Sequence, residues 1–327
     1  MPTQLEIDEA RARWRELAAL DPPLGPVAAF HDERLAELER RPAPDVSIEI
    51  DRGAAESALS EGIPLLERAV LSVNMDDVAD ELRRLALNLA ETAVPGSPAA
   101  LSAERLAEAN IDLEGLLAAS LSDDRDATAG AAKRAEVDAA ALHELLGLAL
   151  QPFLWEAATE LAATLPLDTW DRGYCPVCGA WPALAELVGP ERRRVLRCGR
   201  CGGAWSWLVL LCPYCGNDDH RTLGSRTPVP DVPADEKDAA SQLKAARDAS
   251  AISRIDSCER CHGYLKAIGA YASNAPARLL AEDVATLYLD LVAREAGYRR
   301  PGTVDAATAG IPRLVRERAR ARTLESA

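Results

Sequence analysis

The first half of the chain carries apolar residues at helical spacing. Over residues 1–168, apolar side chains recur every three or four positions, and alanine, leucine, glutamate and arginine dominate. Prolines, glycines and the polar run Ser122–Gly130 interrupt the pattern, which therefore predicts a helical domain. The expected helices are Leu5–Leu20, Gly25–Glu39, Ala54–Glu61, Pro64–Val73, Val78–Thr92, Ala99–Glu108, Leu113–Ala119, Ala131–Leu148 and Pro152–Thr164.

The pattern changes at Leu165, where prolines, glycines and tryptophans become frequent and the apolar spacing turns strand-like. A turn at residues 189–192 predicts a β-hairpin between two of these strands. After the strands, Leu279–Ala296 has a helical pattern that stops at Gly297 and Pro301, and the tail Val304–Ala327 is weakly patterned. The expected strands are Pro182–Val188, Arg193–Arg197, Ala204–Leu211, Ile252–Ser257 and His262–Ala267.

All eight cysteines lie in four Cys-x-x-Cys pairs within 87 residues. We call each pair, with its flanking turn, a knuckle. Two thiolates at this spacing can bind one metal ion from a single turn, and two such turns complete a tetrahedral site. The sequence therefore predicts two four-cysteine metal sites. In chain order the knuckles are Cys175/Cys178, Cys198/Cys201, Cys212/Cys215 and Cys258/Cys261.

The spacing of the knuckles indicates how they pair. Nineteen residues separate Cys178 from Cys198, which fits a metal ribbon built around one hairpin. The 42 residues between Cys215 and Cys258 include Thr227–Ser250, a proline-rich and then charged stretch that we interpret as an exposed insertion with a possible short helix at Asp235–Arg247. We expect the first knuckle to join the second and the third to join the fourth, with an interleaved pairing as the alternative.

Four thiolates in a tetrahedron suit either zinc or a single iron ion, and the spacing does not decide between them. Such a site has no open position for a bound water, so hydrolytic metal catalysis is not expected and the chain is not predicted to be an enzyme. The roles that remain for such a site are to stabilise the fold, to transfer electrons or to present a binding surface. His220 and His262 lie near knuckles, but the cysteines already fill both sites.

The bulk composition favours a globular protein that binds no nucleic acid. Hydrophobic residues make up 48% of the 327 residues, and the net charge of −15 repels phosphate backbones. We interpret the local arginine cluster as a solvated turn. The alternative hypothesis is a docking patch for an acidic partner. The cluster comprises Arg192, Arg193, Arg194, Arg197 and Arg200. Since no signal peptide or membrane span is visible, we expect a cytoplasmic protein without stable membrane insertion.

At this point the knuckles and their flanks resemble a known family, the formate dehydrogenase accessory protein family FdhE. The resemblance covers about residues 150–300, while residues 1–150 match only in being helical. The chain departs from the family mainly in the insertion Thr227–Ser250 and the extended tail. The segments that carry the resemblance are Trp170–Gly179, Cys198–Cys201, Cys212–Asn217, Cys258–Lys266 and Glu282–Asp290.

The resemblance implies a multidomain α+β protein that binds the catalytic subunit of formate dehydrogenase and is required for its activity. It implies that all eight cysteines are ligands, holding two metal ions. The expected parts are a helical domain at 1–168, rubredoxin-like or zinc-ribbon modules at 169–211 and 212–275, the second interrupted at 227–250, and a C-terminal helix and tail at 276–327. The alternatives are a zinc-ribbon nucleic-acid-binding protein and a rubredoxin-like electron carrier.

Overall fold

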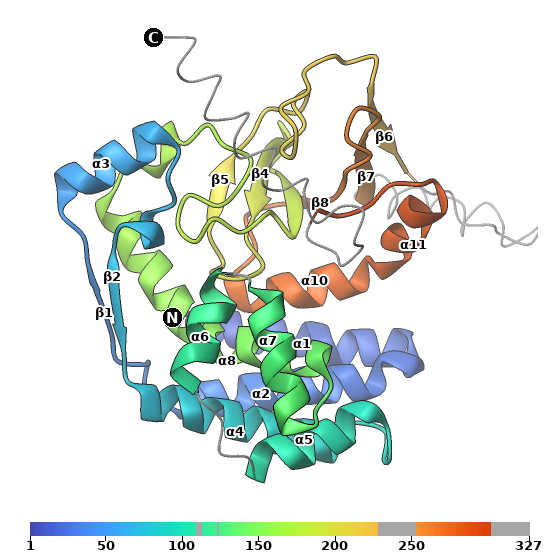
Figure 1. Cartoon of the computed structure of the whole chain (residues 1–327). Helices are drawn as coiled ribbons and strands as arrows, with labels where there is room; N and C mark the ends of the chain where they lie inside the picture. The colour runs from blue at the N-terminus through green and yellow to red at the C-terminus, as the bar shows by residue number, and fades with distance from the viewer. Residues whose placement is uncertain (109–112, 123, 228–252, 302–327) are drawn as a thin grey trace, which may run out of the picture.

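The computed structural model describes residues 1–108, 113–122, 124–227 and 253–301. It has a helical amino-terminal half and a carboxy-terminal half built on a six-stranded sheet (Figure 1), so the predicted mixed α+β class is confirmed. The helices of the first half are α1 Gln4–Leu20, α2 Gly25–Arg40, α3 Arg52–Glu61, α4 Met75–Thr92, α5 Pro98–Glu108, α6 Leu113–Ser122, α7 Arg125–Ala135 and α8 Ala139–Thr164.

Several helices start at side chains that cap free backbone groups. Thr3 forms a capping box with Glu6 at the start of α1, and the Asp51 carboxylate accepts from the backbone N–H of Ala54 at the start of α3. Gly62 ends α3 in the left-handed conformation. The Asp124 side chain caps the start of α7 as the Asp51 side chain caps α3. The break predicted over Ser122–Gly130 is therefore wrong beyond its first residues.

The predicted helix Ala131–Leu148 is wrong at its start, because residues 131–135 end α7 and Glu136 breaks the helix at φ 55°. From Ala139 onwards it is continuous with the predicted helix Pro152–Thr164, and together they form α8, which passes through Pro152. Proline has no N–H, so the carbonyl of Leu148, four residues earlier, loses its helical partner. Arg34 of α2 donates to that carbonyl at 3.1 Å instead. A buried side chain from another helix therefore compensates for the proline, and α8 forms the centre of the helical core.

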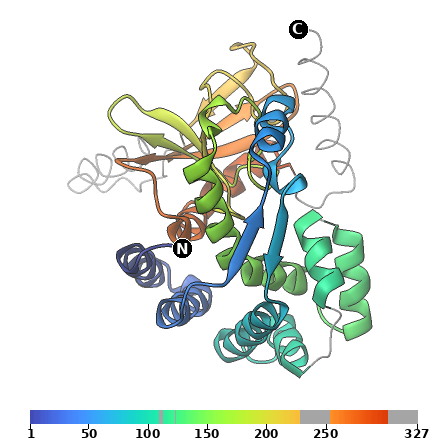
Figure 2. The ribbon, with the colours of Figure 1, turned by 90° about the vertical axis from the view of Figure 1, so that its left-hand side faces the viewer.

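A small sheet was missed in the helical half. The predicted helix Pro64–Val73 is a 3-10 turn, Leu65–Glu67, followed by strand β2, Val70–Val73. Strand β2 pairs antiparallel with β1, Val46–Glu49, and Figure 2 shows the two strands side by side. Both strands start and end near β-branched residues, which favour extended backbone.

The large sheet has the order β5-β4-β3-β8-β7-β6. All neighbours are antiparallel except β3 and β8, which run parallel with Ala185 opposite Ala267. This parallel pair joins the strands around the first two knuckles to those around the last two. The strands are β3 Leu184–Val188, β4 Arg193–Arg197, β5 Ala204–Ser206, β6 Leu223–Arg226, β7 Ser253–Cys258 and β8 Tyr264–Ala270.

The predicted helix Leu279–Ala296 is two helices, α10 Leu279–Ala285 and α11 Leu287–Glu295, which follow a 3-10 turn at Pro276–Arg278. The break falls at Thr286, whose hydroxyl donates to the carbonyl of Glu282. No helix in the described part of the chain is both long and apolar enough to cross a membrane. The predicted insertion beyond Thr227, its helix Asp235–Arg247 and the tail Val304–Ala327 lie outside the described residues.

Candidate metal centres

Each knuckle is a tight reversal of the backbone around its second cysteine. In the first three, the glycine that follows this cysteine has a positive φ, 73° at Gly179, 70° at Gly202 and 63° at Gly216. The N–H of Gly179 donates to the carbonyl of Cys175 at 3.0 Å, which closes the turn. The fourth knuckle uses His262 at φ 53°, a conformation that costs a non-glycine residue on the order of 1 kcal/mol.

The structure brings the eight cysteines into two groups of four. In each group the four Sγ atoms lie within 4.8 Å of one another, and all eight cysteines are free thiols. The first group comprises the first and second knuckles, and the second group comprises the third and fourth. The predicted pairing is therefore confirmed, and the interleaved alternative is not what the structure shows.

The sulfur spacing fits a tetrahedral metal. Metal–sulfur bonds of about 2.3 Å place tetrahedral sulfurs about 3.8 Å apart. In the first group, Sγ of Cys175 lies 3.5 Å from that of Cys201. In the second, Sγ of Cys212 lies 3.8 Å from that of Cys261, and Cys215 lies 3.7 Å from Cys258. Both groups therefore fit one ion each.

Burial affects the protonation of Cys175 in the first group. Burial raises the pKa of the Cys175 thiol well above its ordinary value. A metal ion must displace such protons before it binds, so its affinity falls as the pH falls.

The first knuckle is hydrogen-bonded to the helical half. The backbone N–H groups of Leu65 and Leu66 donate to the carbonyls of Pro176 and Val177, both at 2.9 Å. The hydroxyl of Tyr174 donates to the carbonyl of Gly62 at 2.6 Å. The 3-10 turn that replaces a predicted helix thus binds the loop between Cys175 and Cys178.

The second knuckle is held by the helical half as well. Gln151 of α8 donates to the carbonyl of Gly199 at 2.9 Å, and Arg200 donates to the carbonyl of Leu121 at 3.0 Å. A Cβ at Gly202 would lie 2.5 Å from Pro276 and 3.2 Å from the ring of Trp155. The first group is therefore enclosed between α8 and the turn that precedes α10.

The second group is held by the sheet. Asn217 donates to Sγ of Cys258 at 3.4 Å, and the hydroxyl of Tyr214 donates to the carbonyl of Tyr264 at 3.1 Å. A Cβ at Gly263 would come within 2.8 Å of the Tyr214 ring and 3.1 Å of Sγ of Cys261. The residue after His262 must therefore be glycine for the fourth knuckle to close.

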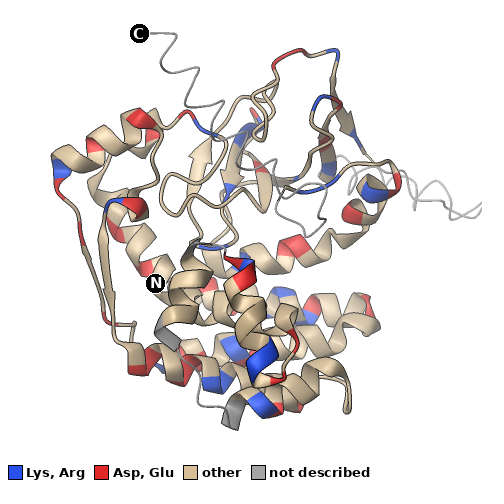
Figure 3. Ribbon diagram, viewed as in Figure 1, with Lys and Arg blue, Asp and Glu red and all other residues tan. Residues whose placement is uncertain are grey.

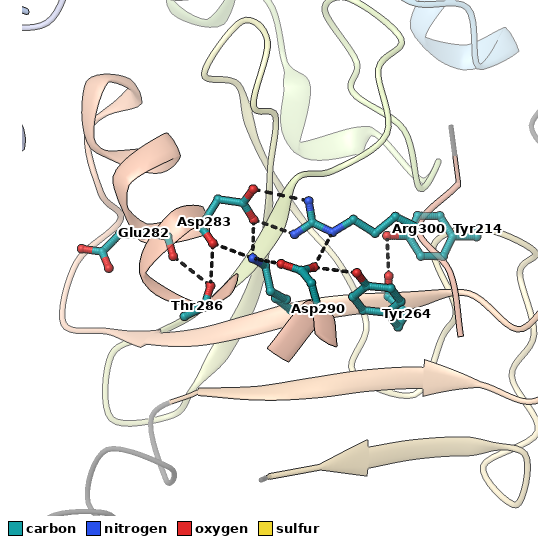
Figure 4. Close-up of polar contacts among 8 residues, drawn as sticks. Tyr214, Tyr264, Glu282, Asp283, Thr286, Asp290 and Arg300 are labelled. Atoms are coloured by element: carbon teal, nitrogen blue, oxygen red, sulfur yellow. Dashed lines mark hydrogen bonds and ion pairs between the residues drawn. The ribbon is translucent and has the colours of Figure 1, made fainter. Parts of the chain in front are cut away.

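A cluster of charged side chains around the buried Lys266 fixes the C-terminal helices beside the second group (Figure 4). Nζ of the fully buried Lys266 lies 2.8 Å from Asp283 and 2.7 Å from Asp290, while Arg300 lies 2.6 Å from Asp283. The hydroxyl of Tyr264 donates to Asp290 at 2.6 Å. Burial alone would raise the pKa of Asp283, but the charges of Arg300 and Lys266 outweigh burial and lower it. Sequence reasoning missed this cluster, although it had singled out the segments that contain Lys266, Asp283 and Asp290.

The arginine cluster is largely used inside the fold. Arg197 pairs with the buried Glu186 at 2.6 Å, Arg194 pairs with Asp256 at 3.2 Å, and Arg200 binds Leu121 as described above. Arg192 and Arg193 are exposed. Figure 3 shows basic and acidic residues interspersed over the ribbon. Most arginines of the predicted docking patch are therefore not available to an acidic partner. The same cluster was the observation that favoured nucleic-acid binding, so that alternative loses its support as well.

The histidines join neither cysteine group in the described part of the chain. His31 is buried and stacks on Trp14 with ring centroids 4.5 Å apart. Among the described residues, the groups able to hold a metal contain cysteines alone, so neither His220 nor His262 joins them.

Comparisons with known proteins agree with this architecture. Residues 238–305 match the sequence model of the family described as FdhE, C-terminal domain. A "Protein FdhE homolog" of Shewanella baltica (strain OS185) is 32% identical over 130 residues, which are 39% of this chain and 36% of that protein. One of Pseudomonas aeruginosa is 31% identical over 166 residues, 49% of this chain and 48% of that protein. The match thus spans less than half the length of these relatives.

The fold is also that of a solved structure, the crystal structure of the FdhE protein from Pseudomonas aeruginosa. The likeness has a TM-score of 0.56 and 24% sequence identity, and it covers 92% of this chain and 95% of that one. It therefore extends to the helical half, which lies outside the residues matched by the family model. The family model, the curated relatives and the shared fold agree with the resemblance predicted from the four knuckles: the chain is similar to FdhE proteins in sequence over part of its length and in fold over most of it.

Proposed function

We propose that this protein is an accessory factor required for formate dehydrogenase activity, acting in the cytoplasm by binding the catalytic subunit of that enzyme. The observation that carries the proposal is the presence of two complete four-cysteine groups on a fold shared with an FdhE protein. In this role the protein is not itself an enzyme, because a closed tetrahedral site offers no position for a substrate or an activated water.

The eight cysteines are the proposed ligands of two metal ions, each iron or zinc. The donor set and the sulfur spacing support this assignment. A bound ion supplies folding free energy and, if it is iron, the capacity to exchange one electron. The residues of the chain orient the thiolates, and Asn217 stabilises the charge on Cys258 by its hydrogen bond.

We propose the same division of the chain into working parts that the sequence suggested. Residues 1–168 form a helical platform, 169–211 and 212–275 form the two metal modules, the second interrupted at 227–250, and 276–327 form a C-terminal helix and tail. Direct hydrogen bonds from the helical half to the first two knuckles support a platform role.

The test is formate dehydrogenase activity and catalytic-subunit abundance in a strain that lacks this gene. We expect activity to be lost while the subunit remains present, and the wild-type gene to restore it. Genes carrying Cys175→Ser or Cys258→Ser should fail to restore activity, whereas Lys133→Met, an exposed substitution on α7, should restore it. Unchanged activity in the deletion strain would refute the proposal. Failure to co-purify the tagged protein with the subunit would refute direct binding.

A further inference from the structure

The two cysteine groups meet directly through the backbone of their knuckles. Gly173, two residues before Cys175, packs against Pro213, the residue that follows Cys212. A Cβ at Gly173 would lie 1.8 Å from the carbonyl oxygen of Pro213 and 2.5 Å from its carbonyl carbon. Carbon atoms in contact are normally about 3.5–4.0 Å apart, so a larger residue at 173 would push the two knuckles apart. The segment entering the first knuckle thus supports the third.

A row of aromatic rings continues this contact. Tyr174 and Trp181 flank the first knuckle, and their rings pack edge to face with centroids 5.7 Å apart. Trp181 packs in the same way on Tyr214 of the third knuckle, with centroids 5.5 Å apart. Tyr214 is buried, and its hydroxyl donates to the carbonyl of Tyr264, which follows the fourth knuckle. The rings therefore connect the first knuckle to both knuckles of the second group.

Strand β4 holds the segment that leads into the third knuckle. A terminal nitrogen of Arg194 donates to the carbonyls of Leu208 and Leu211 at 3.1 and 3.3 Å. Because this guanidinium binds the backbone, the chain leaves the sheet after Ser206, although the apolar sequence predicted a strand as far as Leu211. Strand β4 lies between the first and second knuckles, so the first module positions the third knuckle from this side as well.

The first group is positioned by a different part of the molecule. Its two knuckles are hydrogen-bonded to α8, to the end of α6 and to the turn at Leu65 in the helical half. Burial differs in the same sense, because Cys178 alone is half-buried in the first group, whereas Cys215 and Cys261 are half-buried in the second. A chelator therefore reaches the second group more readily than the first.

We propose that the first metal centre, once filled, positions the third knuckle, so that the second centre closes around its ion only while the first is intact. A bound ion supplies folding free energy to its own knuckles, and Gly173, Trp181 and Arg194 extend that order to the second group. The two ions are acquired in the order first then second and released in the reverse order. This relation rests on the proposed metal ligands and on no property of formate dehydrogenase.

The test follows the thiols of the zinc-loaded full-length protein. A chelator and N-ethylmaleimide are added together, and mass spectrometry of peptides measures how fast each knuckle is alkylated. In the wild type, the second group should be alkylated before the first. Gly173→Ala keeps all eight thiols and should speed alkylation of the second group at least tenfold, while the first group, held by the helical half, is unchanged. The matched control Gly147→Ala, on α8 with nothing within 4 Å of the added Cβ, should speed neither.

Two cysteine variants test the direction of the dependence. Cys178→Ser and Cys261→Ser each remove a half-buried thiol, one from each group. Cys178→Ser should leave the second group unprotected by zinc as well, whereas Cys261→Ser should leave the first group protected. Trp181→Leu removes the ring between the knuckles without touching a ligand, and it should reproduce the selective effect of Gly173→Ala if that variant does not fold.

The proposal is overturned if the first group is alkylated first or both groups react together in the wild type. It is equally overturned if Gly173→Ala matches the wild type or speeds both groups alike, if Cys178→Ser leaves the second group protected, or if Cys261→Ser exposes the first. Rapid alkylation of all eight cysteines without chelator would overturn the ligand assignment and this proposal together, whereas protected thiols released in the wrong order overturn this proposal alone.

Discussion

The two cysteine groups have the same local structure and different surroundings. Both are built from two knuckles with matching turns, but the first is hydrogen-bonded to α8 and to the turn at Leu65, whereas the second is held by β6, β8 and the charged cluster around Lys266. Three of the four cysteines are buried in the first group and two in the second. The knuckles determine how the metal is bound. The surroundings determine which part of the fold is destabilised when the metal is lost.

The largest expected effect is the loss of a ligand in the first group. Cys198→Ser and Cys258→Ser replace equally buried thiols in the two groups. Because the first group joins the halves of the molecule, Cys198→Ser should lower the free energy of unfolding by on the order of 5 kcal/mol and destabilise the helical half. Cys258→Ser should leave that half folded. Circular dichroism at 222 nm during heating, with metal analysis, distinguishes them, and identical melting curves would remove the contrast.

The next effect concerns the second group alone. Lys266→Met leaves the partly buried Asp283 and Asp290 with only Arg300 as a counter-charge. Removing one partner from such a cluster costs about 3–5 kcal/mol. We expect hydrogen exchange to rise in β8, α10 and α11 and not in α8. The control Lys133→Met should change stability by less than about 0.5 kcal/mol, and exchange rising equally in α8 would contradict a local role.

A smaller effect should be confined to the first group. Gln151→Leu removes the hydrogen bond to the carbonyl of Gly199 and the acceptor of Arg34. Leaving these buried groups unpaired should cost about 1–3 kcal/mol. Chelator competition should extract the first metal faster, while extraction of the second is unchanged. Gln4→Leu, at an exposed position on α1, is the control, and equal acceleration at both groups would argue against the contact.

The smallest effect is a pH dependence of the helical half. Burial lowers the pKa of His31 to about 3, with Arg34 adding to the effect, while the unfolded side chain titrates near 6.5. The unfolded state therefore binds the proton first, and stability is lost as the pH falls below 6.5. Between pH 7.5 and 5.5 the loss should be about 1.4 kcal/mol.

Urea unfolding of the wild type and of His31→Gln at these two pH values measures that loss. The variant should lack the His31 share of the pH dependence. If the free energy of unfolding changes equally between the two pH values in the wild type and in His31→Gln, then His31 does not carry the effect.

The sequence predicts well what is local. A knuckle is specified within five residues, and the ribbon hairpin Leu184–Arg197 follows from its turn, so the cysteine groups and strands β3 and β4 were placed correctly. The joining of the two ribbons was not predicted, because the parallel pair β3–β8 depends on residues far apart in sequence.

The other misses have the same physical origin. The chain continues as a helix through Pro152 because Arg34 reaches the freed carbonyl, and strand β5 stops at Ser206 because Arg194 binds the carbonyls that follow it. In each case a charged side chain from a distant segment overrides a local preference. Sequence spacing does not reveal such a partner. For the same reason, arginines that bind inside the fold were interpreted as exposed residues of a surface cluster.

The parallel pair β3–β8 also sets an order of events during synthesis. Ala185 of β3 cannot pair until its partner Ala267 has been synthesised, roughly 80 residues later. A ribosome adds that many residues in ~4–16 s. During that interval β3 pairs with β4 on one side, and its other side is an open strand edge, the kind of surface that captures other chains. The nascent first module therefore passes through a period of exposure to aggregation that ends only when the last knuckle and β8 have been made.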